Sequence, residues 1–147
     1  MRNGKFEVTG CPFCNPDLTR EFLLESTIAY AMFDKFPVSN GHTLIIPKRH
    51  CADYFELSFK EQSACWFMLN KVKKIITTKF NPDGFNIGIN VNKSAGQTVS
   101  HVHIHLIPRY ENDVANAIGG VRNVIPLKGN YLKDQSHKVI RKNALNK

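Results

Sequence analysis

The sequence predicts an α+β domain in which an antiparallel sheet of about five strands packs against one long helix, followed by an irregular C-terminal extension. Three observations predict this fold. Short apolar runs bounded by turn residues recur along the chain, one stretch has the spacing of an amphipathic helix, and both patterns disappear beyond Arg109. At 147 residues, 42% of them hydrophobic, the chain is long enough for one domain with an ordinary core.

The first expected strands lie in the N-terminal third of the chain. Residues 22–24 and 28–33 are short apolar runs separated by a turn signal at 25–27, and we expect them to form two strands of a meander. Residues 34–42 contain Pro, Ser, Asn and Gly in close succession, which is typical of a loop. The apolar run at 43–47 predicts the next strand.

The long helix has a clear start signal. Ser58 and Glu61 have the spacing of a capping box, in which each side chain accepts a hydrogen bond from the other residue's backbone. Apolar residues then recur at intervals of three and four, the period of one helix face. The predicted apolar stripe comprises Ala64, Phe67, Met68, Val72, Ile75 and Ile76.

Two further strands are expected after the breaker at residues 81–84. Apolar and polar residues alternate from Phe85 to Val91, which indicates a half-buried strand. After a turn at 94–96, residues 99–108 predict the last strand. Side chains alternate across a strand, so the three histidines of this segment should share one face, opposite Val102, Ile104 and Leu106.

The face that carries His101, His103 and His105 is a candidate ligand site. Each imidazole needs partners for two ring nitrogens, which makes three of them unfavourable on a core-facing surface. A solvated histidine face and an all-histidine metal site are the alternative interpretations. The upstream segment Gly96-Gln97-Thr98 favours a phosphate ligand, because it offers a glycine for close backbone approach and two polar side chains.

These motifs together resemble the signature of the histidine-triad (HIT) superfamily of nucleotide hydrolases and transferases. The resemblance extends from Cys11 to Arg109, which places a domain at residues 1–110 and a C-terminal extension at 111–147. It also implies a HIT-like fold. The matching elements are Asp34, the segment Gly41-His42-Thr43-Leu44-Ile45-Ile46-Pro47, Asn90, Gly96-Gln97-Thr98 and His101-Val102-His103-Ile104-His105-Leu106-Ile107-Pro108.

The resemblance implies that His103 attacks the α-phosphorus of a nucleotide and forms a nucleotidyl-histidine intermediate. Neutral imidazole is a usable nucleophile near pH 7, which fits this role. His105 would donate a hydrogen bond to a phosphate oxygen. The other implied substrate-binding residues are Asp34 for the ribose, with His42, Asn90, Gly96, Gln97 and Thr98 around the phosphates.

Diadenosine polyphosphates or related adenylylated compounds are the expected substrates, and hydrolysis is the expected reaction. A nucleoside phosphoramidase and a nucleotidyltransferase or phosphorylase are alternatives, because the triad serves all of these reactions. A non-enzymatic function is a further alternative: a module, stabilised by zinc, that binds nucleotide or nucleic acid without turnover. Steeply salt-dependent binding would be typical of that module.

The N-terminal segment carries a candidate metal site. Cys11 and Cys14 have the spacing of a zinc knuckle, and zinc takes four Cys or His ligands in a tetrahedron. Some members of the superfamily complete such a site with residues that correspond here to His50 and His101, which implies a closed, structural Zn²⁺ site. A redox-active pair, metal-free thiols and Cys51 in place of His50 are alternatives.

Charge and hydropathy restrict the partners. The net charge of +8 favours an anionic ligand such as a nucleotide or dinucleoside polyphosphate, although the basic stretch at 133–147 is more typical of a solvated tail than of a nucleic-acid site. No apolar stretch is long enough to span a membrane, and the first ten residues do not resemble a secretory signal. We therefore expect a cytoplasmic protein with no membrane partner. The family resemblance implies a homodimer.

Overall fold

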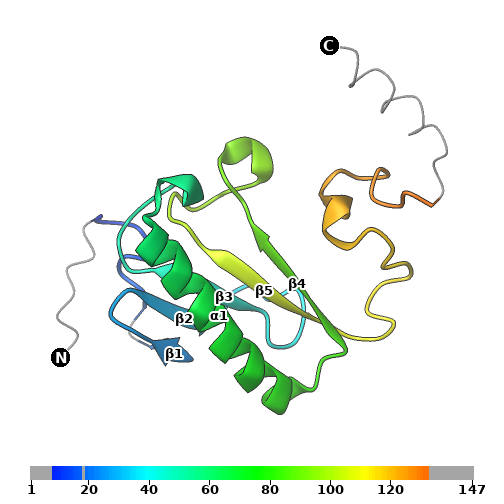
Figure 1. Cartoon of the computed structure of the whole chain (residues 1–147), viewed down its shortest axis with the longest axis horizontal. Coiled ribbons are helices and arrows are strands. Elements are labelled where there is room, and N and C mark those ends of the chain that lie inside the picture. The colour runs from blue at the N-terminus through cyan, green and yellow to red at the C-terminus, as the bar shows by residue number, and fades with distance from the viewer. Residues whose placement is uncertain (1–7, 18, 133–147) are drawn as a thin grey trace, which may run out of the picture. The chain divides into compact units, whose positions relative to one another are not determined.

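The computed structural model describes residues 8–17 and 19–132, so the basic stretch at 133–147 lies outside the described residues. The chain divides into two compact units, Met1–Tyr110 and Glu111–Lys147. The first unit holds a five-stranded antiparallel sheet and the helix α1 (Phe59–Phe80), which confirms the predicted α+β fold (Figure 1). In spatial order the strands are β1 (Leu24–Glu25), β2 (Ala29–Phe33), β3 (Thr43–Pro47), β5 (Ile104–Arg109) and β4 (Gly84–Ile89).

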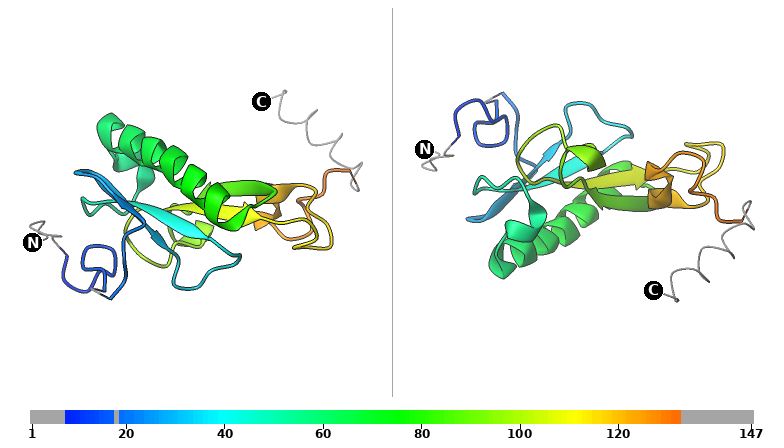
Figure 2. Two further views of the ribbon diagram at one scale, coloured as in Figure 1. Left: turned by 90° about the horizontal axis from the view of Figure 1, so that it is seen from below. Right: turned by 90° about the horizontal axis from the view of Figure 1, so that it is seen from above.

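The sheet of this unit has two differently covered faces. Helix α1 packs on one of them, and the N-terminal loop with its two cysteines lies on the other (Figure 2). Alternation along the strands divides the side chains accordingly, since Ala31 and Ile45 pack toward α1 whereas Met32 and Leu44 pack under the N-terminal loop. The face opposite α1 is the one that can present polar groups from β5.

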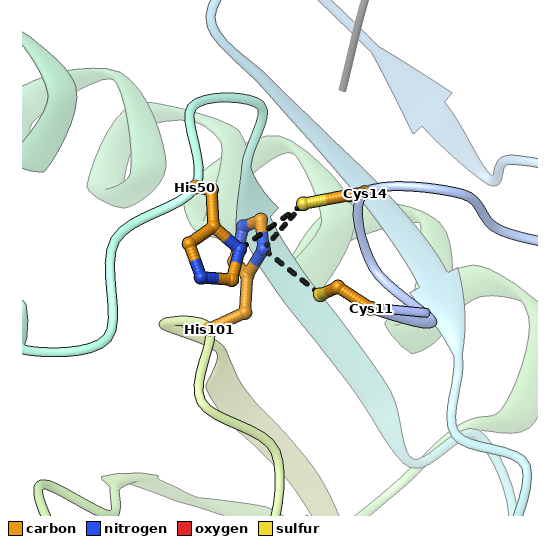
Figure 3. A group of neighbouring side chains, drawn as sticks. All are labelled: Cys11, Cys14, His50 and His101. Atoms are coloured by element: carbon orange, nitrogen blue, oxygen red, sulfur yellow. Dashed lines mark hydrogen bonds between the residues drawn. The ribbon is translucent and has the colours of Figure 1, made fainter. Parts of the chain in front are cut away.

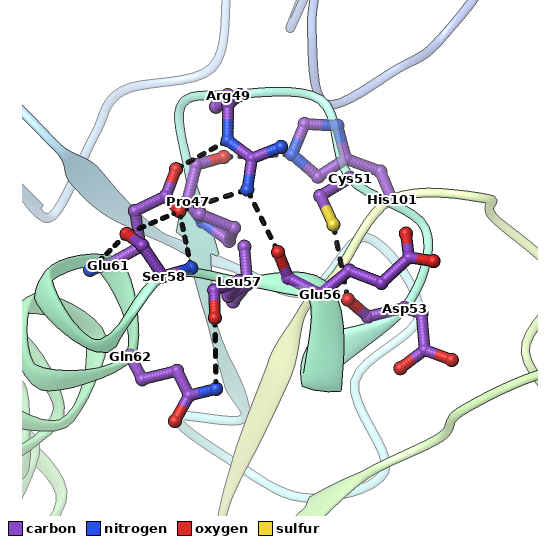
Figure 4. A network of polar contacts seen from close by, with 10 residues as sticks. All are labelled: Pro47, Arg49, Cys51, Asp53, Glu56, Leu57, Ser58, Glu61, Gln62 and His101. Atoms are coloured by element: carbon purple, nitrogen blue, oxygen red, sulfur yellow. Dashed lines mark hydrogen bonds and ion pairs between the residues drawn. The ribbon is translucent and has the colours of Figure 1, made fainter.

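Helix α1 begins as the sequence predicted. Ser58 and Glu61 form the capping box, and Glu61 also accepts two hydrogen bonds from Arg49, at 2.7 and 2.9 Å (Figure 4). The predicted apolar stripe was partly wrong, because Phe67 is 63% exposed. The buried positions are Cys65, Met68, Leu69, Val72 and Ile76.

The last strand is shorter than the sequence predicted. Strand β5 starts at Ile104, whereas residues 99–103 were also expected to be extended. The backbone of this stretch has other partners: the Val102 N–H donates to the carbonyl of Cys51 at 2.7 Å, and the His101 N–H donates to that of Val99 at 2.8 Å. The first two histidines therefore lie in an irregular segment, and only His105 lies within the strand.

The second unit contains the 3₁₀ helix η3 (Gly120–Val124) among its described residues. Gly119 adopts a φ of +94°, and a Cβ placed on it would lie 2.4 Å from the carbonyl oxygen of Gly129. Arg122 donates to that same carbonyl at 3.2 Å. The chain therefore turns back between Gly119 and Gly129, where only a glycine fits at position 119. Within the described residues, no helix has the length and apolar character that crossing a bilayer requires.

Candidate active site and metal centre

Two cysteines and two histidines meet on the sheet face opposite α1. The Sγ atoms of Cys11 and Cys14 lie 3.5 and 3.4 Å from His101 Nδ1, and Cys14 Sγ lies 3.1 Å from His50 Nδ1 (Figure 3). All four potential ligand atoms are within 4.8 Å of one another. The structure thus brings together the four residues that the family resemblance implied as zinc ligands.

The chemistry of this cluster fits a tetrahedral metal ion. His101 Nε2 lies 2.8 Å from the carbonyl of Pro47, so that nitrogen carries the hydrogen and the Nδ1 lone pair faces the thiols. Burial lowers the pKa of His101 to about 4, which keeps the ring neutral. Cys51, the alternative ligand, instead points its thiol at the carbonyl of Asp53 (Figure 4). The cluster could therefore hold a zinc ion with Cys11, Cys14, His50 and His101 as ligands.

His103 lies next to this cluster in a defined orientation. Its Nδ1 donates to the backbone carbonyl of His101 at 2.8 Å, so Nε2 carries the lone pair. The side chain is 8% exposed, and its ring centroid lies 5.1 Å from that of Phe13, in the loop between the two cysteines. An imidazole whose Nδ1 is held as a donor and whose ring is packed can present Nε2 as a nitrogen nucleophile.

A chain of hydrogen bonds fixes the tautomer of His105 as well. The Val38 N–H donates to His42 Nδ1 at 3.2 Å, so the hydrogen of His42 is on Nε2. His42 Nε2 lies 3.0 Å from His105 Nδ1 and donates to it. The carboxylate of Asp34 approaches both rings, with Oδ2 at 3.5 Å from His42 Nε2 and 3.9 Å from His105 Nδ1. His105 therefore carries its own hydrogen on Nε2.

The trio of Asp34, His42 and His105 has the composition of a metal site but not the protonation state of one. A neutral histidine that binds metal through Nε2 must carry its hydrogen on Nδ1. In His42 the Nδ1 atom accepts the Val38 N–H, which excludes that hydrogen. We therefore interpret the trio as a hydrogen-bonded relay.

The Nε2–H of His105 is a buried hydrogen-bond donor for which the described residues offer no acceptor. Its Nε2 atom is inaccessible to solvent and has no hydrogen-bond partner among the described residues. Burial, followed by the neighbouring His103 and His42, lowers the pKa of His105 to about 4, and burial also lowers the pKa of His42. An unsatisfied buried N–H is destabilising by about 1–3 kcal/mol, and such groups are typical of binding sites.

The predicted phosphate-binding residues follow β4. The 92–98 loop comprises Asn92 to Thr98 and includes the 3₁₀ helix η2 (Lys93–Ala95). Gly96 has a φ of +87°, and a Cβ placed on it would lie 4.0 Å from the amide nitrogen of Asn90. Thr98 is exposed at the end of the loop. Both ends of the Gln97 amide bind backbone groups, the N–H of Asn92 and the carbonyl of Ala52.

A pocket of about 440 Å³ adjoins the relay. Asp34 and His42 line it together with Phe33 and Phe80, whose rings pack edge to face with centroids 5.9 Å apart. The pocket combines aromatic carbon with polar groups, which is typical of sites for small organic ligands.

Sequence reasoning missed two residues that shape the site. Phe13 packs on the ring of His103, and Val38 sets the tautomer of His42 through its backbone N–H. The position of Phe13 between the two cysteines could have indicated that it follows the metal loop into the site. No sequence signal identifies a backbone donor such as that of Val38, since every residue except proline has one.

Comparison with known proteins identifies the family. The family model of the HIT domain matches residues 15–112, which is more than half of the chain. The protein therefore belongs to the HIT, or histidine-triad, family, as the sequence motifs predicted.

Relatives within the family carry different activity names. The chain is 36% identical to adenosine 5'-monophosphoramidase of Schizosaccharomyces pombe over 74% of its length and 81% of that protein. It is 35% identical to bis(5'-adenosyl)-triphosphatase of Dictyostelium discoideum over 65% of its length and 64% of that protein. It is 31% identical to AP-4-A phosphorylase of Mycobacterium tuberculosis over 67% of its length and 52% of that protein. All three names agree with the predicted class of nucleotide hydrolases and transferases, but each names a different reaction.

A solved structure is informative about the metal cluster, that is, the four candidate zinc ligands Cys11, Cys14, His50 and His101. The fold matches a zinc-bound histidine triad family protein from Mycobacterium smegmatis with a TM-score of 0.66 and 30% identity, covering 74% of this chain and 80% of that one. A member of the family with a similar fold thus binds zinc.

Proposed function

We propose that this protein hydrolyses dinucleoside polyphosphates or related adenylylated compounds through a nucleotidyl-histidine intermediate on His103. The observation that carries the proposal is the buried Nε2–H of His105, which has no hydrogen-bond partner in the described part of the chain and whose ring centroid is 5.0 Å from that of His103. A nucleophile with its lone pair free and a donor that lacks an acceptor fit an anionic group placed between them.

In the first step, the Nε2 lone pair of His103 attacks the α-phosphorus. A P–N bond forms, the P–O bond to the remaining phosphate chain breaks, and the leaving polyphosphate takes the electron pair. Negative charge on the non-bridging oxygens receives the hydrogen bond from His105 Nε2–H, with backbone groups near Gly96 as further donors. Because the Nδ1–H of His103 donates to the carbonyl of His101, the positive charge that develops on the ring is stabilised.

In the second step, water attacks the same phosphorus on the opposite side from His103. The P–N bond breaks, its electron pair returns to Nε2, and the water loses its proton to solvent as the nucleoside monophosphate forms. Asp34 belongs to the relay and also lines the neighbouring pocket, so it is the candidate partner for the ribose, as the family resemblance implied.

The proposal also includes a structural Zn²⁺ ion and a homodimer. Zn²⁺ held by Cys11, Cys14, His50 and His101 would have no open coordination position, so it would supply structural support and no chemistry to the reaction. We also propose a homodimer, as the resemblance implied. Strand β4 lies at the edge of the sheet in the described part of the chain, which leaves one side of its backbone available for pairing with a second copy.

A nucleoside phosphoramidase is the second candidate. The similarity to the Schizosaccharomyces pombe monophosphoramidase, which extends over 81% of that protein, favours it. The two reactions share the intermediate on His103 and differ in the leaving group, because an amine must gain a proton as it leaves whereas a polyphosphate need not. Relative kcat/KM values for a diadenosine polyphosphate and an adenosine phosphoramidate would separate them.

Intact-protein mass spectrometry after a brief quench without acid tests the mechanism. Wild type and His103→Ala would each be mixed with a diadenosine polyphosphate. We expect wild type alone to gain the mass of one adenylyl group, and His103→Ala to bind nucleotide while losing nearly all turnover. Near-normal turnover in His103→Ala would remove His103 from the mechanism. Tight nucleotide binding without any product or adduct in wild type would favour the non-catalytic binding module.

A further inference from the structure

Gln97 links two parts of the backbone that are far apart in the sequence. Its Nε2 donates to the carbonyl of Ala52 at 2.8 Å, and its Oε1 accepts the N–H of Asn92 at 2.7 Å. Both distances are those of good hydrogen bonds. The side chain therefore forms a bridge from the 92–98 loop to the segment around residue 52.

The segment that receives this bridge begins at a residue of the metal cluster. Ala52 follows His50 by two positions, and the carbonyl of Cys51, between them, accepts the N–H of Val102 at 2.7 Å. Arg49, on the other side of His50, is held by the carboxylate of Glu61 in α1 and donates to the carbonyl of Glu56 at 3.3 Å (Figure 4). The carbonyl that Gln97 binds thus belongs to a well-anchored segment.

Apart from the side chain of Gln97, the 92–98 loop is held by backbone hydrogen bonds within its own 3₁₀ turn, from the N–H groups of Ala95, Gly96 and Gln97 to the carbonyls of Asn92 and Lys93. Residues 92–96 are all exposed, so apolar packing contributes little to their order. Asn92 and Gly96 both have positive φ, at +69° and +87°, a conformation that non-glycine residues such as Asn92 adopt at some energetic cost. Because the backbone bonds stay within the loop, the position of the loop on the domain depends on hydrogen bonds to a rigid neighbour, such as that from Gln97 to Ala52.

We propose that Gln97 is a positioning residue that couples the order of the 92–98 loop to the metal cluster. In this role it acts through the backbone instead of contacting phosphate directly. The coupling is reciprocal, because a free-energy link between two sites must act in both directions. Filling the cluster would order the loop, and loosening the loop would weaken metal binding. The inference rests on the proposed function only where it takes the loop to bind phosphate.

Amide hydrogen exchange on the full-length, zinc-loaded protein tests the bridge. Gln97→Ala removes both hydrogen bonds, and Gln97→Met removes them while keeping the side-chain length. We expect both variants to speed exchange of the Asn92 amide and of the loop by about three- to tenfold. Gln62→Ala is the matched control, because its amide also donates to backbone carbonyls, those of Tyr54 and Leu57, but does not touch the loop.

Zinc affinity and kinetics test the coupling. In competition with a chromogenic chelator, both Gln97 variants should release zinc at a several-fold lower chelator concentration, and Gln62→Ala should match wild type. With nucleotide substrate, KM should rise by about three- to tenfold while kcat changes less, since the loop would contribute to phosphate binding in ground and transition states alike.

Two results would overturn the inference. Unchanged exchange together with a raised KM would make Gln97 a direct phosphate ligand, as the family motif implied. Faster exchange with unchanged zinc affinity would mean that the loop and the cluster are independent. If no nucleotide is turned over at all, the proposed function fails, but the exchange and zinc measurements still decide the role of Gln97.

Discussion

At the scale of single residues, backbone groups determine which nitrogen of each key histidine carries the hydrogen. The carbonyls of Pro47 and His101 accept from the rings of His101 and His103, and the N–H of Val38 donates to that of His42. The remaining nitrogen of His101 faces the two cysteines, that of His42 faces His105, and that of His103 is the proposed nucleophile. The spacing of the histidines in the sequence carries no information about these tautomers, because the partners are backbone groups brought close by the fold.

The relay predicts a specific effect of His42→Asn. Without the donor from His42, the hydrogen of His105 can move to Nδ1, which turns a lone pair toward the phosphate in place of an N–H. We expect kcat to fall about 100-fold, as for loss of one transition-state donor. Nitrogen-15 chemical shifts of His105 would show the tautomer change. An unaltered tautomer with a normal kcat would exclude the relay.

The pKa of His105 predicts how stability depends on pH. The pKa in the folded protein is lowered to about 4 by burial, whereas an unfolded histidine titrates near pH 6.5. The unfolded state thus binds more protons between these values, so His105 should lower the unfolding free energy as pH falls from about 6.5 to 4 and have no effect above. Urea unfolding of wild type and His105→Asn across this range would show a shallower dependence in the variant. Parallel curves would contradict the prediction.

At the scale of elements, local signals predicted some features correctly and tertiary contacts overrode others. The start of α1 and the bounds of β3 are as predicted, because a capping box and an apolar run between turn residues are local properties. The start of β5 was wrong because Val102 bonds to Cys51, a contact with a segment about fifty residues earlier. The prediction that Phe67 lies on the buried face of α1 was wrong, because α1 has more apolar residues than its buried face accommodates and the sequence does not show which of them face the sheet.

The turn before β3 depends on Gly41. This glycine has a φ of +85°, and a Cβ placed on it would lie 2.9 Å from Cδ2 of Phe80 at the end of α1. Gly41→Ala should therefore lower the unfolding free energy by about 1–3 kcal/mol. Gly88→Ala is the matched control, since no heavy atom lies within 4 Å of the added Cβ in β4. Denaturant melts in which both variants resemble wild type would show that the turn tolerates a side chain.

At the scale of the whole molecule, the metal cluster ties together parts of the chain that the sequence keeps far apart. The contacts of Cys14 with His50 and His101 span 36 and 87 residues. Ligand spacing indicated only Cys11 and Cys14, and the other two were implied by the family resemblance. Physical reasoning from the sequence could not supply them, because nothing local shows that β3 and β5 pair and so bring His50 and His101 together.

Metal removal should destabilise the protein through these long-range contacts. Zinc binding to a site that exists only in the folded chain contributes its binding free energy to folding. We therefore expect complete removal by a chelator to lower the melting temperature by on the order of 10 °C, and Cys14→Ser to melt low with or without chelator. Cys65→Ser is the control: Cys65 is buried in α1 outside the cluster, so this variant should still respond to the chelator as wild type does. An unchanged melting temperature after metal analysis shows the protein to be zinc-free would mean that hydrogen bonds among the cluster residues suffice to hold the N-terminal loop on the sheet.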